Sequence, residues 1–181
     1  MKHYDYQKHL HRLWEKAVKQ YESGQRGSGT YFETEEEMWL RANGITPQEI
    51  YDFAEDYVSS GEPDFPTFAM ICDVRRNYFL EKLHGQQSDN KVRMDSYTPK
   101  DAEVEGIRWL PRIIEKAKAK LHGELDDDTM YCCGGDRAFL KEHDIHPAEF
   151  LRVVAEHEHD DRAIINWVKQ RSAKARADAQ G

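Results

Sequence analysis

The stretch IRWLPRIIEKAKAKLHG, residues 107–123, decides the fold class of this chain. Its apolar residues recur at spacings of three and four, which places them on one face of a helix. Pro111 falls in the first turns, where its missing N–H costs little, and Gly123 is placed to end the helix. We therefore predict a helix whose buried stripe consists of Ile107, Leu110, Ile113, Ile114, Ala117 and Leu121.

The same pattern occurs 100 residues earlier in the chain, where an equivalent apolar stripe runs from Leu10 to Tyr21 and Gly24 follows it. The register continues without a gap beyond this helix. A repeat of this kind indicates that one module has been duplicated. The residues that recur unchanged 100 positions later are Leu10, Arg12, Glu15, Lys16, Ala17, Tyr31, Leu40, Ile45, Pro47 and Glu49.

Three shorter helices are expected after the long helix in each copy. Thr34 and Glu37 have the spacing of a capping box, which predicts a helix start at Thr34. Thr46 before Pro47 predicts the next start, and His146 before Pro147 predicts its counterpart. No segment alternates apolar and polar residues as a half-buried strand does. The predicted fold is all-α: two tandem four-helix modules related by an internal repeat.

Composition shifts suggest the domain boundaries. We predict a first module over 3–84, a polar linker over 85–103, a second module over 104–172 and a flexible tail over 173–181. A module of roughly 80 residues has a core that is only marginally sufficient alone. The two copies are therefore expected to pack on each other.

The overall composition narrows the function classes. The chain has 181 residues, 39% of them hydrophobic and 33% charged, and a formal net charge of −8. A negative net charge argues against wholesale nucleic-acid binding. No apolar run is long enough for a membrane helix, and the N-terminus lacks the apolar stretch of a signal peptide. Three cysteines do not form a disulfide framework, so a reducing cytoplasm is the expected location.

The second copy resembles a known bacterial family. The motif Leu-Pro-Arg…Lys-Ala, at residues 110–112 and 116–117, is similar to the opening helix of the family called domain of unknown function 5069. Tyr131-Cys132, the run 139–151 and the segment 160–168 resemble the middle and closing parts of that family. The resemblance implies a small helical domain and no particular activity. The first copy differs, with His11 at the position of Pro111, and would make the chain a tandem member.

The most suggestive functional pattern is a row of basic residues. Arg108, Arg112, Lys116 and Lys120 step by four along the expected helix, and Lys8, Arg12 and Lys16 repeat the row in the first copy. Like charges at this spacing repel, so the row does not help the helix itself. One interpretation is a site for a small anionic ligand or an acidic protein partner, since Arg112 can bind a carboxylate or phosphate in a bidentate manner. The other is a solvated face.

Cysteines and histidines in the second copy offer two further interpretations. Cys132 and Cys133 precede an expected helix, and a helix N-terminus can activate a thiol. The histidines at 143, 146, 157 and 159 lie near one another in sequence, but zinc needs about four converging ligands and no tight ligand spacing is present. We favour the plainer explanations of these patterns, which are a structural, partly buried thiol and histidines that cap helices at the surface.

Three hypotheses follow. The first is a non-catalytic binding or adaptor module without cofactor or metal, whose ligand-binding residues are Arg12, Lys16, Tyr31, Arg108, Trp109, Arg112, Lys116, Tyr131 and Cys132. The second is a small enzyme with a pocket around Arg112, Lys116, Tyr131 and Cys132. The third is a metal-bound module that uses the cysteine pair and histidines. We favour the first because the features that both copies keep are basic and aromatic, and no known catalytic motif is present.

Overall fold

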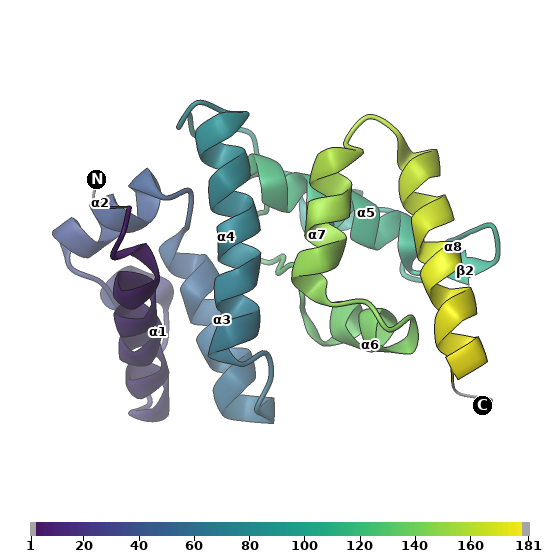
Figure 1. The fold of residues 1–181 in the computed structure, drawn as a ribbon. Coiled ribbons are helices and arrows are strands. Elements are labelled where there is room, and N and C mark those ends of the chain that lie inside the picture. Colours follow the sequence, from purple (N-terminus) through teal and green to yellow (C-terminus); the bar gives the residue numbers. More distant parts are fainter. Residues whose placement is uncertain (1–2, 179–181) are drawn as a thin grey trace. The chain divides into compact units, whose positions relative to one another are not determined.

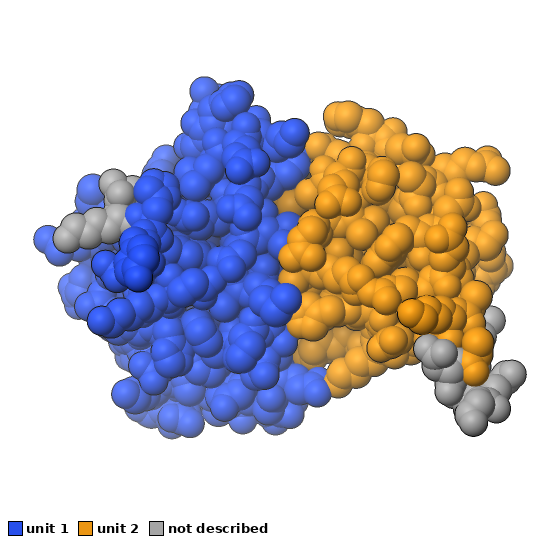
Figure 2. Space-filling model, viewed as in Figure 1, with its two compact units in different colours: residues 1–87 blue, residues 88–181 orange. Residues whose placement is uncertain are grey.

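The computed structural model describes residues 3–178, which form eight α-helices, two short 3-10 helices and a two-stranded hairpin (Figure 1). The all-α prediction is confirmed. Residue contacts divide the chain into unit 1, residues 1–87, and unit 2, residues 88–181 (Figure 2). None of the helices in the described part of the chain is long and apolar enough to cross a membrane. Each unit is built around its own apolar core.

Unit 1 contains four helices and one 3-10 turn. Its first helix, α1, packs on α3 and on α4, and its apolar stripe of Leu10, Leu13 and Ala17 is fully buried between them. The core is completed by residues of the later helices, among them Ile50, Phe53 and Phe68. The elements are α1 (Tyr6–Glu22), η1 (Ser28–Thr30), α2 (Thr34–Ala42), α3 (Pro47–Ser60) and α4 (Phe65–Glu81).

The starts of α2 and α3 test the capping predictions. Thr46 caps α3 as expected, because its hydroxyl accepts the N–H of Glu49 at 3.1 Å. The box predicted at Thr34 and Glu37 is wrong by one residue: Glu33 is the N-cap of α2, and Glu36 accepts its backbone N–H at 3.1 Å. Glu36, the second residue of the observed capping box, also forms an ion pair with Lys16 of α1.

Unit 2 opens with a segment that composition marked as a linker. Residues 88–103 belong to unit 2, where they form η2 and the start of the hairpin and place Tyr97 in the core. Bonds from Val92 N to the carbonyl of Glu124 (2.8 Å) and from Met94 N to the Asp126 carboxylate (2.8 Å) hold this segment in place. The elements are η2 (Met94–Ser96), β1 (Glu103–Val104), β2 (Ile107–Arg108), α5 (Leu110–His122), α6 (Gly134–Glu142), α7 (Pro147–Glu156) and α8 (Asp161–Asp178).

The long helix of unit 2 begins later than its apolar pattern predicts. Ile107 and Arg108 lie on β2, which pairs with β1 in an antiparallel hairpin, and α5 starts at Leu110. The break occurs at Trp109, whose backbone is left-handed with φ of 71° and therefore cannot continue a helix. Pro111 lies in the first turn and Gly123 ends the helix with φ of 73°, as predicted.

Equivalent helices of the two units begin at nearly constant separation. The starts of α2 and α6, at Thr34 and Gly134, and of α3 and α7, at Pro47 and Pro147, lie 100 residues apart. The last helix, α8, includes most of the segment predicted as a flexible tail and reaches Asp178. The rest of that segment, 179–181, lies outside the described residues.

Candidate functional site

A buried carboxylate organises the start of α6. Asp136 has no exposed surface and accepts three hydrogen bonds, from Trp109 Nε1 (2.9 Å), Lys116 Nζ (2.5 Å) and the backbone N–H of Cys132 (3.0 Å). The Lys116 side chain is only 4% exposed, so the ion pair is shielded from solvent. Such a pair persists only when further hydrogen bonds satisfy its atoms, and here they do.

The backbone before α6 is shaped to reach this carboxylate. Cys132 has a left-handed backbone, with φ of 71°, a conformation that costs a residue with a side chain on the order of 1 kcal/mol. The turn points its N–H at Asp136, while its carbonyl accepts a bond from Arg137 Nη1 at 2.8 Å. Asp136 and Arg137 of α6 therefore fix the strained backbone of Cys132 through its N–H and its carbonyl.

Gly135 lets Trp109 lie against the first turn of α6. A Cβ at this position would be 2.6 and 2.7 Å from two carbons of the Trp109 indole, which is closer than real contacts allow. Gly134 has no such neighbour, since its nearest side-chain atom would be 3.8 Å away. Gly135 therefore makes room for the Trp109 indole, and Gly134 leaves the start of the helix without a covering side chain.

Cys133 is the half-exposed group of the cluster. It is the N-cap residue of α6, and its Sγ accepts a bond from Lys116 Nζ at 3.3 Å. No side chain caps this helix end, and the N–H groups of Gly134 and Gly135 have no partner among the described residues. Unbonded N–H groups at a helix start favour negative charge nearby. A half-buried thiol, a buried ammonium group and a helix N-terminus are therefore adjacent at Cys133.

The thiol of Cys132, the residue before Cys133, lies in a different environment. Cys132 has no exposed surface, and burial raises its pKa to about 12, with the Asp136 carboxylate adding to the shift. The sequence singled out Cys132 as a ligand-binding residue. In the structure the backbone N–H of Cys132 bonds to Asp136, and Cys133 is the thiol that is partly exposed.

Comparison with known proteins identifies the domain that carries this cluster. Residues 96–180 match the sequence profile of a family described as a domain of unknown function (DUF5069). This part of the chain belongs to that family. No curated protein and no solved structure matches the chain significantly. Trp109, Lys116, Cys133 and Asp136 all lie inside the DUF5069 domain.

The basic row of the DUF5069 domain is not a solvated surface. Arg108 is exposed on β2, whereas Arg112, Lys116 and Lys120 are all at least 90% buried on α5. Arg112 donates to the carbonyl of Thr98 at 2.8 Å and lies over the ring of Tyr97. Arg112, Lys116 and Lys120 lie at successive turns of α5, as their spacing predicts. Residues 97–98 cover Arg112, and Asp136 covers Lys116.

The equivalent row of unit 1 is more open. Lys8 and Arg12 are exposed, and Lys16 bonds to Glu36 at 2.6 Å with 31% of its side chain accessible. Burial alone would raise the pKa of Glu36, but the bonds from Lys16 and from Glu33 N lower it. Lys16 and Lys116 therefore make the same ion pair at equivalent positions, and only the second pair is buried.

The two predicted tyrosines are core residues. Tyr31 donates its hydroxyl to the carbonyl of Gln25 at 2.8 Å, and Tyr131 donates to that of Pro147 at 2.8 Å. Each is 1% exposed, and burial raises the pKa of both phenols. Tyr131 and Arg112 bond to backbone carbonyls, whereas Lys116 bonds to Asp136 and Cys133.

Two of the four predicted histidines bond to the helical framework. His146 caps α7 by accepting the N–H of Ala148 at 3.1 Å, as predicted. His143 Nδ1 bonds to the hydroxyl of Ser172 at 2.7 Å. Within residues 3–178, no three side chains of His, Cys, Asp or Glu converge as metal ligands would. The arrangement required by the metal hypothesis is therefore not present in the described part of the chain.

Sequence reasoning missed Asp136, although a signal for it was present. Glu36 stands 100 residues earlier, and both acids lie 20 residues after the lysine that they bind. Glu36 and Asp136 are not identical, so comparing only unchanged residues does not reveal that both are acids at matching positions. A search for conserved charge would have found it.

Proposed function

We propose that the DUF5069 domain is a binding module for a small anionic ligand, which lies against Cys133 at the N-terminus of α6. The observation that carries the proposal is the 3.3 Å contact between the buried ammonium of Lys116 and the half-exposed sulfur of Cys133. The open N–H groups of Gly134 and Gly135 supply hydrogen-bond donors beside it. The proposal keeps the small anionic ligand that the sequence suggested. It places this ligand at a helix N-terminus rather than along a row of basic residues.

We further propose that the two units derive from one duplicated module and that only unit 2 keeps this site. The equivalent helix end in unit 1 has Glu33 as its N-cap and Glu35, Glu36 and Glu37 in its first turn. These carboxylates already supply the negative charge that the helix end favours and would repel an anion. In α6 the only acid of the first turn is Asp136, which Lys116 neutralises.

Alkylation of the thiol tests the proposal, with a neutral and an anionic reagent compared. Iodoacetamide and iodoacetate are similar in size, so the ratio of their rates reports the local potential. We expect one adduct on the native chain, mapped to Cys133, because Cys72 and Cys132 are buried. The rate ratio should favour iodoacetate more than it does for N-acetylcysteine. Labelling elsewhere, or a ratio equal to that of the free thiol, contradicts the proposal.

Two charge variants separate this effect from loss of structure. Lys116→Met should lower the iodoacetate preference, and Asp136→Asn should raise it. A merely loosened site would expose the thiol and change the ratio in the same direction in both. Lys118→Met is the matched control, because Lys118 lies on the same helix but bonds to Asp161 at the surface. It should leave the ratio unchanged.

The same contact favours a second function, in which Cys133 is a nucleophile. The Cys133 sulfur lies beside a cationic side chain at a helix N-terminus, which is the setting of many catalytic cysteines. The sulfur would then bond to an electrophilic atom of the ligand as the bond from that atom to its leaving group breaks with its electron pair. An anionic aromatic disulfide tests this: wild type should release one aryl thiolate per chain, and Cys133→Ser should release none. No release from wild type rejects the second function and leaves the first intact.

A further inference from the structure

The amine of Lys116 and the thiol of Cys133 are two groups that can react with each other and are already in contact. Nζ lies 3.3 Å from Sγ, and the lysine side chain is only 4% exposed. The nitrogen is held in place by Asp136, which is itself bonded to Trp109 and to the backbone N–H of Cys132. Groups held next to each other in this way react far faster than the same groups in solution.

The sulfur of Cys133 is also the one that an oxidant in solution can reach. Of the three cysteines in the chain, Cys72 and Cys132 are buried and Cys133 is partly exposed. Susceptibility to oxidation rises with exposure, and the first product is a sulfenic acid. A sulfenic acid condenses with a thiol to a disulfide or with a nitrogen to a sulfenamide. Its fate therefore depends on which group lies next to the sulfur.

The neighbouring thiol is poorly placed for a disulfide. Burial raises the pKa of Cys132 to about 12, and the thiolate is the form that attacks an oxidised sulfur. Consecutive Cα atoms are also only about 3.8 Å apart, whereas the two Cα atoms of a disulfide are usually about 4.4–6.8 Å apart. The nitrogen of Lys116 is thus the better partner for an oxidised Cys133.

We propose that Cys133 and Lys116 form a reversible sulfenamide cross-link when the chain meets a peroxide. The inference rests on the proposed function for its site, since both use the contact between these two side chains, and it adds a way to switch that site off. In unit 1, Lys16 makes the equivalent ion pair with Glu36, but residue 33 is a glutamate. The cross-link is therefore expected in unit 2 alone.

The cross-link forms in two balanced steps. In the first, the O–O bond of hydrogen peroxide breaks as the Cys133 sulfur bonds to one oxygen; sulfur is oxidised, peroxide is reduced, and the products are the sulfenic acid and water. In the second, Nζ of Lys116 gives one proton to the Asp136 carboxylate, to which it is already bonded, and attacks the sulfur. The S–N bond forms as the S–O bond breaks, and the hydroxyl leaves with a second proton from Nζ as water.

The product no longer carries the charge that the proposed anion site needs. The nitrogen keeps its third hydrogen and is neutral, and the protonated Asp136 is neutral as well. The Cys133 sulfur is blocked in the same step. A thiol reductant reverses the reaction, because it is oxidised to a disulfide while the S–N bond is reduced to the thiol and the amine.

Peroxide treatment of the full chain, followed by trypsin digestion and mass spectrometry without reductant, tests the inference. Trypsin does not cleave after a modified lysine, so the expected product joins residues 113–118 to residues 121–137. Its mass should equal the sum of the two peptides less two hydrogens, and a thiol reductant should separate them. A disulfide between Cys132 and Cys133 would instead leave 121–137 as a separate peptide that lacks two hydrogens.

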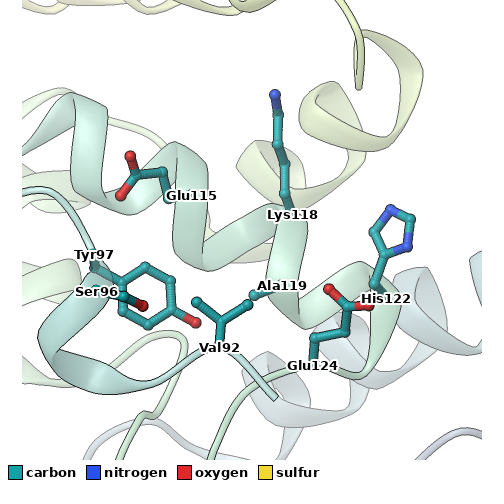
Figure 3. Close-up of a pocket in the computed structure, with 8 residues that line it drawn as sticks. All are labelled: Val92, Ser96, Tyr97, Glu115, Lys118, Ala119, His122 and Glu124. Atoms are coloured by element: carbon teal, nitrogen blue, oxygen red, sulfur yellow. The ribbon is translucent and has the colours of Figure 1, made fainter. Parts of the chain in front are cut away.

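Two arginine variants form a matched pair for this experiment. Lys116→Arg keeps a positive charge beside Asp136, but a guanidinium does not lose its proton and cannot attack the sulfur, so the cross-link should be absent. Lys118→Arg is the control and should cross-link as wild type. Lys118 lies on the same helix but bonds to Asp161 and lines a separate pocket against residues 92–97 (Figure 3). Mapping of the cross-link in wild type decides the case even if a variant does not fold.

Three outcomes would overturn the inference: oxidation of wild type that stops at an acid of Cys133, a disulfide in place of the cross-link, or a cross-link that persists in Lys116→Arg. All three leave the proposed anion site intact, because the preference for iodoacetate is measured without oxidant. A cross-link in a chain without that preference supports the inference and rejects the proposed function.

Discussion

Substitution of Gly135 by alanine should destabilise unit 2, although alanine is the better helix former. The new Cβ would be 2.6 Å from the Trp109 indole, so the ring must move. Overpacking of this kind costs about 1–3 kcal/mol. Movement of the ring also breaks the bond from Nε1 to the Asp136 carboxylate, and a bond to a charged group contributes about 1.5–3 kcal/mol. The helix propensity of alanine offsets about 1 kcal/mol of this.

The net loss in the free energy of unfolding is therefore about 1.5–5 kcal/mol. With a urea dependence of about 1 kcal/mol per molar for a unit of this size, the midpoint should fall by at least about 1.5 M. Gly134→Ala is the matched control: its Cβ would be 3.8 Å from its nearest neighbour, and we expect a change within about 0.5 kcal/mol. Urea unfolding followed by circular dichroism measures both variants. Equal midpoints would refute the role assigned to the contact between Gly135 and Trp109.

Two further predictions concern buried charge. Lys116→Met should cost about 3–5 kcal/mol because it leaves the Asp136 carboxylate buried and unpaired, whereas Lys16→Met at the half-exposed equivalent pair should cost at most about 1 kcal/mol. Urea unfolding of both variants checks this, and similar losses would contradict it. Burial raises the pKa of Asp52 to about 7, so the folded state binds this proton more tightly than the unfolded state does. Stability should therefore fall as the pH rises from about 4 to 7, by up to about 4 kcal/mol from this group, and Asp52→Asn should remove that slope. An unchanged slope in the variant would show that other groups cause it.

The helices could be predicted from sequence because their apolar periodicity reports burial directly. The stripe of Leu110, Ile113 and Ala117 identifies the buried face of α5, and Pro111 and Gly123 mark its ends. The same periodicity did not locate the first residue of the helix. Ile107 continues the pattern by spacing but lies on β2, because the left-handed backbone of Trp109 separates strand from helix.

The burial of the basic row could not be predicted, because it depends on residues that are distant in sequence. Arg112 is covered by Tyr97 and Thr98, which lie in a segment whose polar composition indicated a linker. Lys116 is covered by Asp136, which lies 20 residues farther along. Helical spacing shows that such residues share a face, but only the tertiary fold shows whether that face meets water or another segment.

Comparison of equivalent positions in the two units indicates where a function is to be sought. The pair of a lysine with an acid 20 residues later occurs in both units, so the pair itself is most simply explained by the fold. What differs is the start of the following helix, where Glu33, Thr34 and Glu35 of unit 1 correspond to Cys133, Gly134 and Gly135 of unit 2. The glutamates fill the end of α2 with their own charge, and the small residues leave the end of α6 open. An anion site needs N–H groups that are not already paired, which is why we place the proposed site at the first turn of α6.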